Sequence, residues 1–307
     1  MGVGRWWIYQ RERFPVFAHG ALIAAFSASA VCYSALIRGA SEVALSSLAV
    51  AFGTAFLFFL QLRIADEFKD FEEDARYRPY RPVPRGLVTL RELGILGAVA
   101  VLIQVILALI LDGWLVLLLF IALGYLGLMS AEFFIGAWLR KQPFAYMASH
   151  MAIMPLIDFY ATACDWVPAG TGLAPGLAWF LLISYFNGMV IEIGRKIRAP
   201  ADEEPGVETY SAAWGAYRAV GTWLAAMALC AVCAWVAARE IGFVIPVIVV
   251  LAVVALVALA AAATYLRTQA PGSGKHIERI AGIWCLSMYL IVGVIPLALR
   301  AWAPAWL

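Results

Sequence analysis

The chain has 307 residues, of which 64% are hydrophobic and only 14% are charged. Soluble domains carry about 25% charged residues, so this composition excludes a protein whose main solvent is water. The net charge of +2 provides no basic surface for nucleic acid. The five cysteines are scattered, and the pair Cys230 and Cys233 lies within an apolar run, which is typical of small buried thiols rather than of a redox or zinc site. We therefore expect a protein that lies in a membrane.

Apolar stretches long enough to cross about 30 Å of hydrocarbon recur along the sequence. They leave no room for a separate soluble domain, so residues 1–307 are expected to form one membrane domain. The predicted fold class is an all-α integral membrane bundle of nine transmembrane helices. The predicted spans are 17–37, 44–62, 93–111, 113–130, 142–163, 173–193, 217–238, 242–265 and 281–299.

The distribution of positive charge predicts the orientation of these nine spans. Of the 22 Lys and Arg residues, all but Arg38, Arg239 and Arg300 fall on the side that holds the N-terminus. Because positively charged loops stay in the cytoplasm, we expect a cytoplasmic N-terminus and an external C-terminus in a bacterial-type inner membrane.

Two loops on the predicted cytoplasmic side, residues 63–92 and 194–217, are long and densely charged. Four predicted helices separate them, and an even number of crossings returns the chain to the same face. Both loops are therefore expected to lie over one cytoplasmic cavity.

The first charged loop opens with a regular row of carboxylates. Between Arg63 and Arg76 no Gly or Pro interrupts the sequence, so the second helix is expected to continue through it. Asp66, Asp70 and Asp74 would then lie within about 80° of one another on one helix face. Such a row repels itself unless a cation lies between its members, and its oxygen ligands suit magnesium that bridges a phosphate.

A proline-stiffened segment, Arg78-Pro-Tyr-Arg-Pro-Val-Pro-Arg85, follows these carboxylates. It holds three arginines at fixed spacing, and guanidinium groups match phosphate oxygens, so Arg78 and Arg81 are expected to bind phosphate groups. The alternative is a solvated helix end whose acids pair with the arginines that follow, including Arg76.

These motifs and the number of predicted spans resemble the UbiA superfamily of intramembrane prenyltransferases. That family has nine transmembrane helices and a first motif of the form N-D-x-x-D-x-x-x-D followed by R-x-x-R-P. Here it reads Asp66-Glu67-x-x-Asp70-x-x-x-Asp74 and Arg78-x-x-Arg81-Pro82. The first two positions depart from the family pattern, but both keep oxygen ligands. The resemblance implies Mg²⁺-dependent transfer of a prenyl group from a prenyl diphosphate to a lipophilic, for example aromatic, acceptor.

The second charged loop matches the family in part. Its pattern D-x-x-x-G-x-x-T with a later glycine is met by Asp202, Gly206, Thr209 and Gly215, whereas Arg198 replaces a second aspartate. The expected metal ligands are thus Asp66, Asp70, Asp74, Glu192 and Asp202. The residues expected to contact the diphosphate are Arg78, Arg81, Arg195, Lys196 and Arg198.

Among the polar residues inside the predicted spans, three bear on the site or on packing between helices. His150, about 12 Å from the cytoplasmic end of the fifth span, and Asn187 are expected to belong to the acceptor pocket. Asp158 lies deeper in the membrane, and we expect it to be structural, paired with a neighbouring helix.

Other functions remain open at this stage. Transfer of a phosphosugar to a polyprenyl phosphate would use the basic second loop to bind extra phosphate groups, and a terpene cyclase on the same scaffold would need no acceptor. A transporter is less consistent with the sequence, because the acids concentrate at helix ends and no paired, interrupted spans occur.

Overall fold

The computed structural model describes residues 4–302, and every regular element within them is helical. Seven helices in this part of the chain are long and apolar enough to cross a membrane. They are α2 (Val16–Ile37), α3 (Leu45–Lys69), α5 (Leu90–Leu111), α10 (Leu177–Arg195), α12 (Ala216–Glu240), α13 (Val244–Thr268) and the continuous run Gly274–Trp302. That run comprises α14 (Gly274–Tyr289), the π-helical turn η3 (Leu290–Val294) and α15 (Ile295–Trp302).

The two other predicted spans have a different form. The fourth is α6 (Leu115–Ser130), which is apolar but has only 16 residues. The fifth is divided into α8 (Pro143–Met151) and α9 (Ile153–Trp166), with Ala152 between them. Seven candidate spans are therefore found, and the count of nine stays a prediction.

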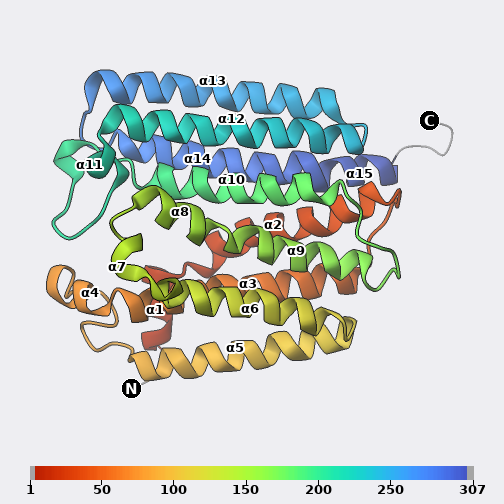
Figure 1. Cartoon of the computed structure of the whole chain (residues 1–307), viewed down its shortest axis with the longest axis horizontal. Coiled ribbons are helices and arrows are strands. Elements are labelled where there is room, and N and C mark those ends of the chain that lie inside the picture. The colour runs from red at the N-terminus through yellow and green to blue at the C-terminus, as the bar shows by residue number, and fades with distance from the viewer. Residues whose placement is uncertain (1–3, 303–307) are drawn as a thin grey trace.

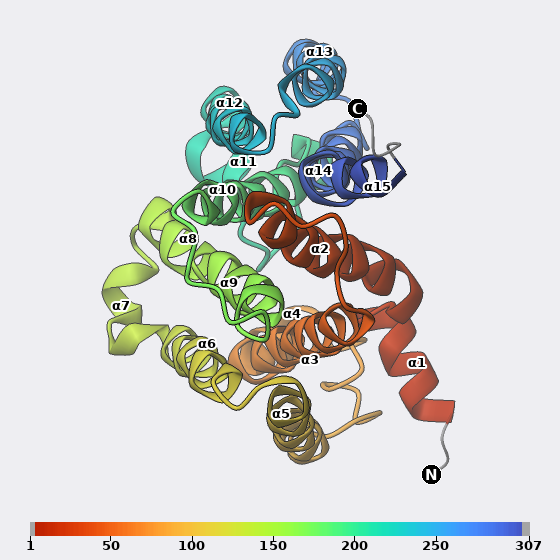
Figure 2. The same ribbon diagram turned by 90° about the vertical axis from the view of Figure 1, so that its right-hand side faces the viewer.

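The long helices run side by side, as Figures 1 and 2 show in two perpendicular views. α2 packs against α3 and α9, and α10 packs against α12 and α14. The short helices α4 (Phe71–Tyr77), α7 (Gly136–Leu139) and α11 (Tyr210–Trp214) lie together at one end of the bundle (Figure 1). This end collects both charged loops, and the loop between α9 and α10 lies at the opposite end.

The most apolar helices lie at the periphery of the bundle. α5 and α13 bury only a small part of their surface inside the protein, which is expected where lipid covers the rest. Buried polar side chains pair between some of the helices: Gln61 of α3 donates a 3.0 Å hydrogen bond to Gln104 of α5. Such pairing is required because hydrocarbon offers no alternative partner.

A short helix, α1 (Gly4–Arg13), precedes the first span and was not predicted from the sequence. Its Tyr9 is buried in a small apolar cluster with Ile64, Val83, Val88 and Leu93. The nearby start of α5 is fixed by a capping box, in which Thr89 and Glu92 bind each other's backbone N–H groups. α1 is thereby attached to the end of α3 that carries the acidic motif.

Candidate active site

A cavity of about 1810 Å³ is lined by residues of both charged loops and by the apolar helices beneath them. Its charged wall includes Asp66, Lys69, Asp70, Arg78, Arg81, Glu192, Arg195, Lys196, Arg198 and Asp202. Its apolar wall includes Leu22, Ile23, Phe26, Phe59, Leu62, Met151, Met154 and Ile191. The two loops thus meet at a single cavity, while its exposure to the cytoplasm stays a prediction.

One glycine brings the two loops into contact. Gly206 of the second loop has a left-handed φ of 74°, and a Cβ placed on it would lie 2.4 Å from the ring of Tyr77 in α4. Only glycine combines this backbone conformation with so close an approach. The second loop therefore packs directly on the helix that follows the acidic motif.

The acidic motif is not one continuous helix, which corrects the sequence prediction. α3 ends at Lys69, Asp70 has φ −90° and ψ 6°, and α4 begins at Phe71. The break removes Asp74 from the common face. Asp66 and Asp70 line the cavity, whereas the buried Asp74 is not among its lining residues.

Asp74 instead holds the arginines that follow it. Its carboxylate oxygens lie 2.9 Å from Arg78 Nε and 2.6 Å from Arg81 Nη1, and Arg13 of α1 is 3.9 Å away. Asp74 therefore pairs with the arginines that follow it, as the alternative prediction of a helix end with acid–arginine pairs describes. Arg78 and Arg81 nevertheless line the cavity, so Asp74 orients both toward it.

Arg13 and Glu67 form a further ion pair, which could not be predicted from the sequence. Glu67, which takes the place of the family's usual aspartate, is buried and accepts a hydrogen bond from Arg13 Nε. The two residues are 54 positions apart, and no local pattern links them. Glu67 therefore faces α1, and its Oε1 atom is already bound by Arg13.

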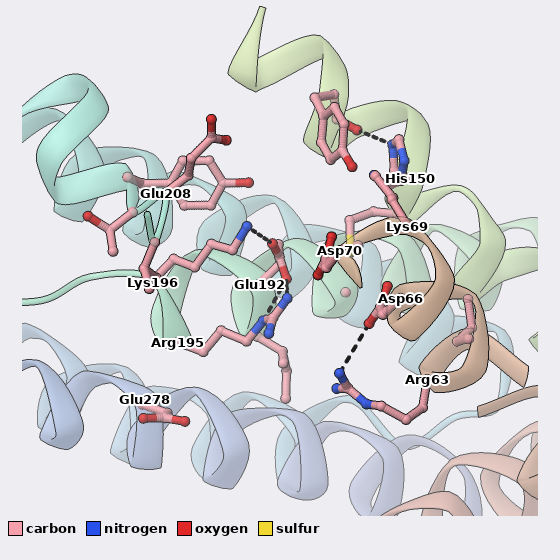
Figure 3. A pocket seen from close by; sticks show the side chains of 18 of the residues that line it. Arg63, Asp66, Lys69, Asp70, His150, Glu192, Arg195, Lys196, Glu208 and Glu278 are labelled. Atoms are coloured by element: carbon pink, nitrogen blue, oxygen red, sulfur yellow. Dashed lines mark hydrogen bonds and ion pairs between the residues drawn. The ribbon is translucent and has the colours of Figure 1, made fainter. Parts of the chain in front are cut away.

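Asp70 lines the cavity and forms no ion pair with any residue between 4 and 302. Burial and the nearby charges of Asp66 and Asp74 raise its pKa above the ordinary value, although Lys69 acts in the opposite direction. No contact reaches its carboxylate in Figure 3, whereas Asp66 pairs with Arg63 at 3.3 Å. An ionised Asp70 thus costs stability at neutral pH, and a bound cation would remove this cost.

The carboxylates of the cavity fit a magnesium ion that also binds water and phosphate. In the region from residue 4 to 302, no three His, Cys, Asp or Glu side chains converge as a closed metal site would require. Magnesium commonly uses only one or two protein carboxylates and completes its shell with water and substrate phosphates. Asp66 and Asp70 fit this second arrangement.

The charged residues of the second loop line the cavity but bind one another (Figure 3). Glu192 accepts from Arg195 at 2.5 Å and from Lys196 at 3.0 Å. Arg198 pairs with Glu204 at 3.1 Å and approaches the backbone oxygen of Asp202.

Asp202 itself accepts a 2.7 Å hydrogen bond from the backbone N–H of Gly272, which lies in the turn before α14. One of its carboxylate oxygens is therefore committed to holding this turn in place.

The residues expected in the acceptor pocket also line the cavity. His150 stacks on Tyr146, with the two ring centroids 3.9 Å apart, and Asn187 accepts a hydrogen bond from Cys230. The buried Asp158 is not a lining residue, and Tyr289 of α14 donates to it at 3.4 Å. This pairing with a neighbouring helix confirms the structural partner predicted for Asp158.

Comparisons with known proteins extend this description. The family model of the UbiA prenyltransferase family matches residues 21–275, whereas no curated protein sequence matches the chain. An apo UbiA homologue from Aeropyrum pernix K1 shares the fold with a TM-score of 0.66 and 16% identity, over 89% of this chain and 96% of that one.

Two further solved structures are similar. A digeranylgeranylglyceryl phosphate synthase has a TM-score of 0.59 and 15% identity, with coverage of 95% of this chain and 99% of that one. A UbiA homologue from Archaeoglobus fulgidus bound to DMAPP and Mg²⁺ has a TM-score of 0.53 and 11% identity, with coverage of 92% and 98%. The family model spans most of the chain and the apolar helices agree with it, so the chain is an integral membrane protein that belongs to the UbiA prenyltransferase family.

Proposed function

We propose that this protein is a Mg²⁺-dependent intramembrane prenyltransferase that transfers a prenyl group from a prenyl diphosphate to a lipophilic acceptor. One observation carries the proposal: Asp66 and Asp70 share a cavity with Arg195 and Lys196, and the cavity continues between apolar helices (Figure 3). The UbiA homologue solved with DMAPP and Mg²⁺ supports the choice of donor substrate and metal.

In this proposal Asp66 and Asp70 would hold the magnesium ion together with phosphate oxygens. Glu192 and Asp202 line the same cavity, and they would become further ligands only by exchanging their present partners for the ion. Bound magnesium would neutralise negative charge that develops on the leaving diphosphate. Asp74 acts indirectly, because it orients the arginines of the first loop.

The cationic side chains have the role of binding phosphate oxygens directly. They are Arg78, Arg81, Arg195, Lys196 and Arg198. The apolar wall excludes water from the allylic cation, which would otherwise be hydrolysed. Phe26, Phe59 and Tyr289 line the same wall, and a ring face turned to the cavity would stabilise positive charge.

The proposal includes the finer topology. α6 forms the fourth of nine spans and the α8–α9 pair forms the fifth, so that residues 1–307 constitute one membrane domain with a cytoplasmic N-terminus and an external C-terminus. The bacterial-type inner membrane is its proposed location. The clustering of Lys and Arg in the loops at one end supports this orientation.

Radiolabelled substrates test the proposed reaction. In one assay, the protein in lipid nanodiscs receives labelled geranyl, farnesyl or geranylgeranyl diphosphate with a membrane lipid extract. In a second assay, it receives labelled phosphoribosyl diphosphate with a polyprenyl phosphate. We expect label to enter the lipid product only from a prenyl diphosphate, and chelation of Mg²⁺ to stop transfer.

Three other outcomes would support the alternative functions. Transfer only from phosphoribosyl diphosphate would support the phosphosugar alternative, and release of a cyclic hydrocarbon without acceptor would support a cyclase. Solute flux through proteoliposomes without chemical turnover would support a transporter.

A further inference from the structure

The tautomer of His150 can be deduced from one hydrogen bond. Its Nδ1 lies 2.8 Å from the backbone oxygen of Tyr146. A carbonyl oxygen only accepts hydrogen bonds, so Nδ1 carries the proton and Nε2 of the neutral ring presents a lone pair. Nε2 is buried and has no hydrogen-bond partner within residues 4–302, and His150 lines the cavity.

Two aromatic rings fix the direction of this lone pair. The imidazole stacks on Tyr146, and the ring of Phe133 meets it edge to face with a centroid distance of 6.0 Å. Phe133 belongs to the short turn η1 (Glu132–Phe134), in which three consecutive residues have left-handed φ values of 49°, 54° and 60°. Non-glycine residues rarely adopt this conformation, and such strain concentrates at functional sites.

Charged side chains from three other elements lie around His150, next to the metal-binding carboxylates. His150 faces Lys69 and Asp66 from α3, Glu132 from η1 and Glu192 from α10. Lys69 Nζ lies 4.5 Å from the centre of the Tyr146 ring, and Glu132 holds this ammonium group at 3.1 Å. Because Lys69 directly precedes Asp70, the imidazole lies at the same end of the cavity as the proposed diphosphate site (Figure 3).

We infer that His150 is a catalytic base that accepts the proton of a hydroxyl-bearing acceptor through Nε2. The inference rests on the proposed function. The bond between C1 of the prenyl group and the diphosphate oxygen breaks, and its electron pair leaves with the diphosphate. A lone pair of the acceptor oxygen forms the new bond to C1, and the hydroxyl proton passes to Nε2. The cavity that His150 lines also includes Met129, Pro143, Tyr146, Met151 and Met154, which suits an acceptor with an apolar body.

The experiment separates ionisation of the donor from proton transfer. Geranyl diphosphate labelled with ¹⁸O at the bridging position reports ionisation, because the label moves to non-bridging positions when the ion pair recombines. Phenol, 1-naphthol, 1-hexadecanol and a lipid extract of the expressing cells serve as acceptor probes. The variants are His150→Gln and His150→Asn, which keep hydrogen-bonding capacity but are not bases. His276→Ala is the matched control, since this histidine is exposed and does not line the cavity.

We expect both His150 variants to transfer the prenyl group at least 100-fold more slowly, the lower end of a general base contribution, while ¹⁸O movement stays within threefold of the original protein. Added imidazole should restore part of the transfer, and His276→Ala should have no effect. The inference is overturned if either His150 variant keeps transfer within threefold, if both variants lose ionisation and transfer together, or if the original protein ionises geranyl diphosphate but uses no hydroxylated probe. If the original protein moves no ¹⁸O with geranyl, farnesyl or geranylgeranyl diphosphate, the proposed function itself fails.

Discussion

Asp70 and Asp74 are four residues apart but lie in opposite electrostatic surroundings. Asp70 faces other carboxylates in the cavity, whereas Asp74 is bound by arginines on the far side of the helix break. Asp70, whose charge is repelled by its neighbours, is available to a ligand. Asp74, whose charge is already neutralised by arginines, stabilises the protein.

Neutral substitutions at these two positions should therefore have different effects. Asp70→Asn removes repulsion, so we expect a melting temperature equal to or above that of the original protein and a loss of at least 100-fold in Mg²⁺-dependent transfer. Asp74→Asn leaves its arginines without a partner, and we expect it to destabilise the protein by about 1–3 kcal/mol because the arginines are partly exposed. Thermal unfolding and turnover at saturating Mg²⁺ check both. Near-normal activity of Asp70→Asn would contradict the metal assignment.

Contact between α4 and the second loop determines how the two charged segments face each other. The contact is made by Gly206. Its left-handed backbone conformation and the nearby ring of Tyr77 both exclude a side chain at this position. A substitution at Gly206 thus tests whether the relative position of the loops matters.

Gly206→Ala should destabilise the protein and raise the KM for prenyl diphosphate about tenfold or more, because the new methyl group would push Tyr77 and α4 away from the loop. Gly170→Ala is the matched control. Gly170 also has a left-handed φ, but a Cβ placed there meets nothing within 4 Å. Comparison of the two variants in unfolding and kinetic assays separates backbone strain from the lost contact. Equal kinetic effects of both would show that the contact has no role.

The apolar helices could be predicted from sequence because hydrocarbon imposes a minimum length and excludes charge. The course of the chain at the ends of these helices could not be predicted in the same way. No Gly or Pro marks the break at Asp70, and the pairing of Glu67 with Arg13 joins residues 54 positions apart, so no local pattern predicts either feature. The pairing of Glu192 with Arg195 and Lys196 follows the i,i+3 and i,i+4 spacing of a helix. These ion pairs could therefore have been predicted from the sequence.

At the scale of the whole molecule, the arrangement requires both charged loops to lie on one side of the membrane. The exposed residues Ala75 and Ala201 belong to the two loops, and Ala169 lies at the opposite end of the bundle. All five native cysteines are buried, so they should react slowly with polar thiol reagents.

Single cysteines at these three positions test the orientation. In intact cells, a membrane-impermeant maleimide should label Ala169→Cys but neither Ala75→Cys nor Ala201→Cys, and all three should react after the membrane is opened. Labelling of only one of the two loop positions from outside would exclude a shared cavity. Labelling of both from outside, but not of Ala169→Cys, would invert the proposed orientation.

The left-handed turn at Glu132–Phe134 implies a conflict between stability and activity in this protein. Each such non-glycine residue costs about 1–2 kcal/mol, so variants that relax the turn should survive higher temperatures. The same relaxation would release Phe133 from the imidazole that it holds. A screen that selects thermostable variants would therefore enrich glycine at this turn and discard the most active proteins, whereas a screen for turnover would retain the strain.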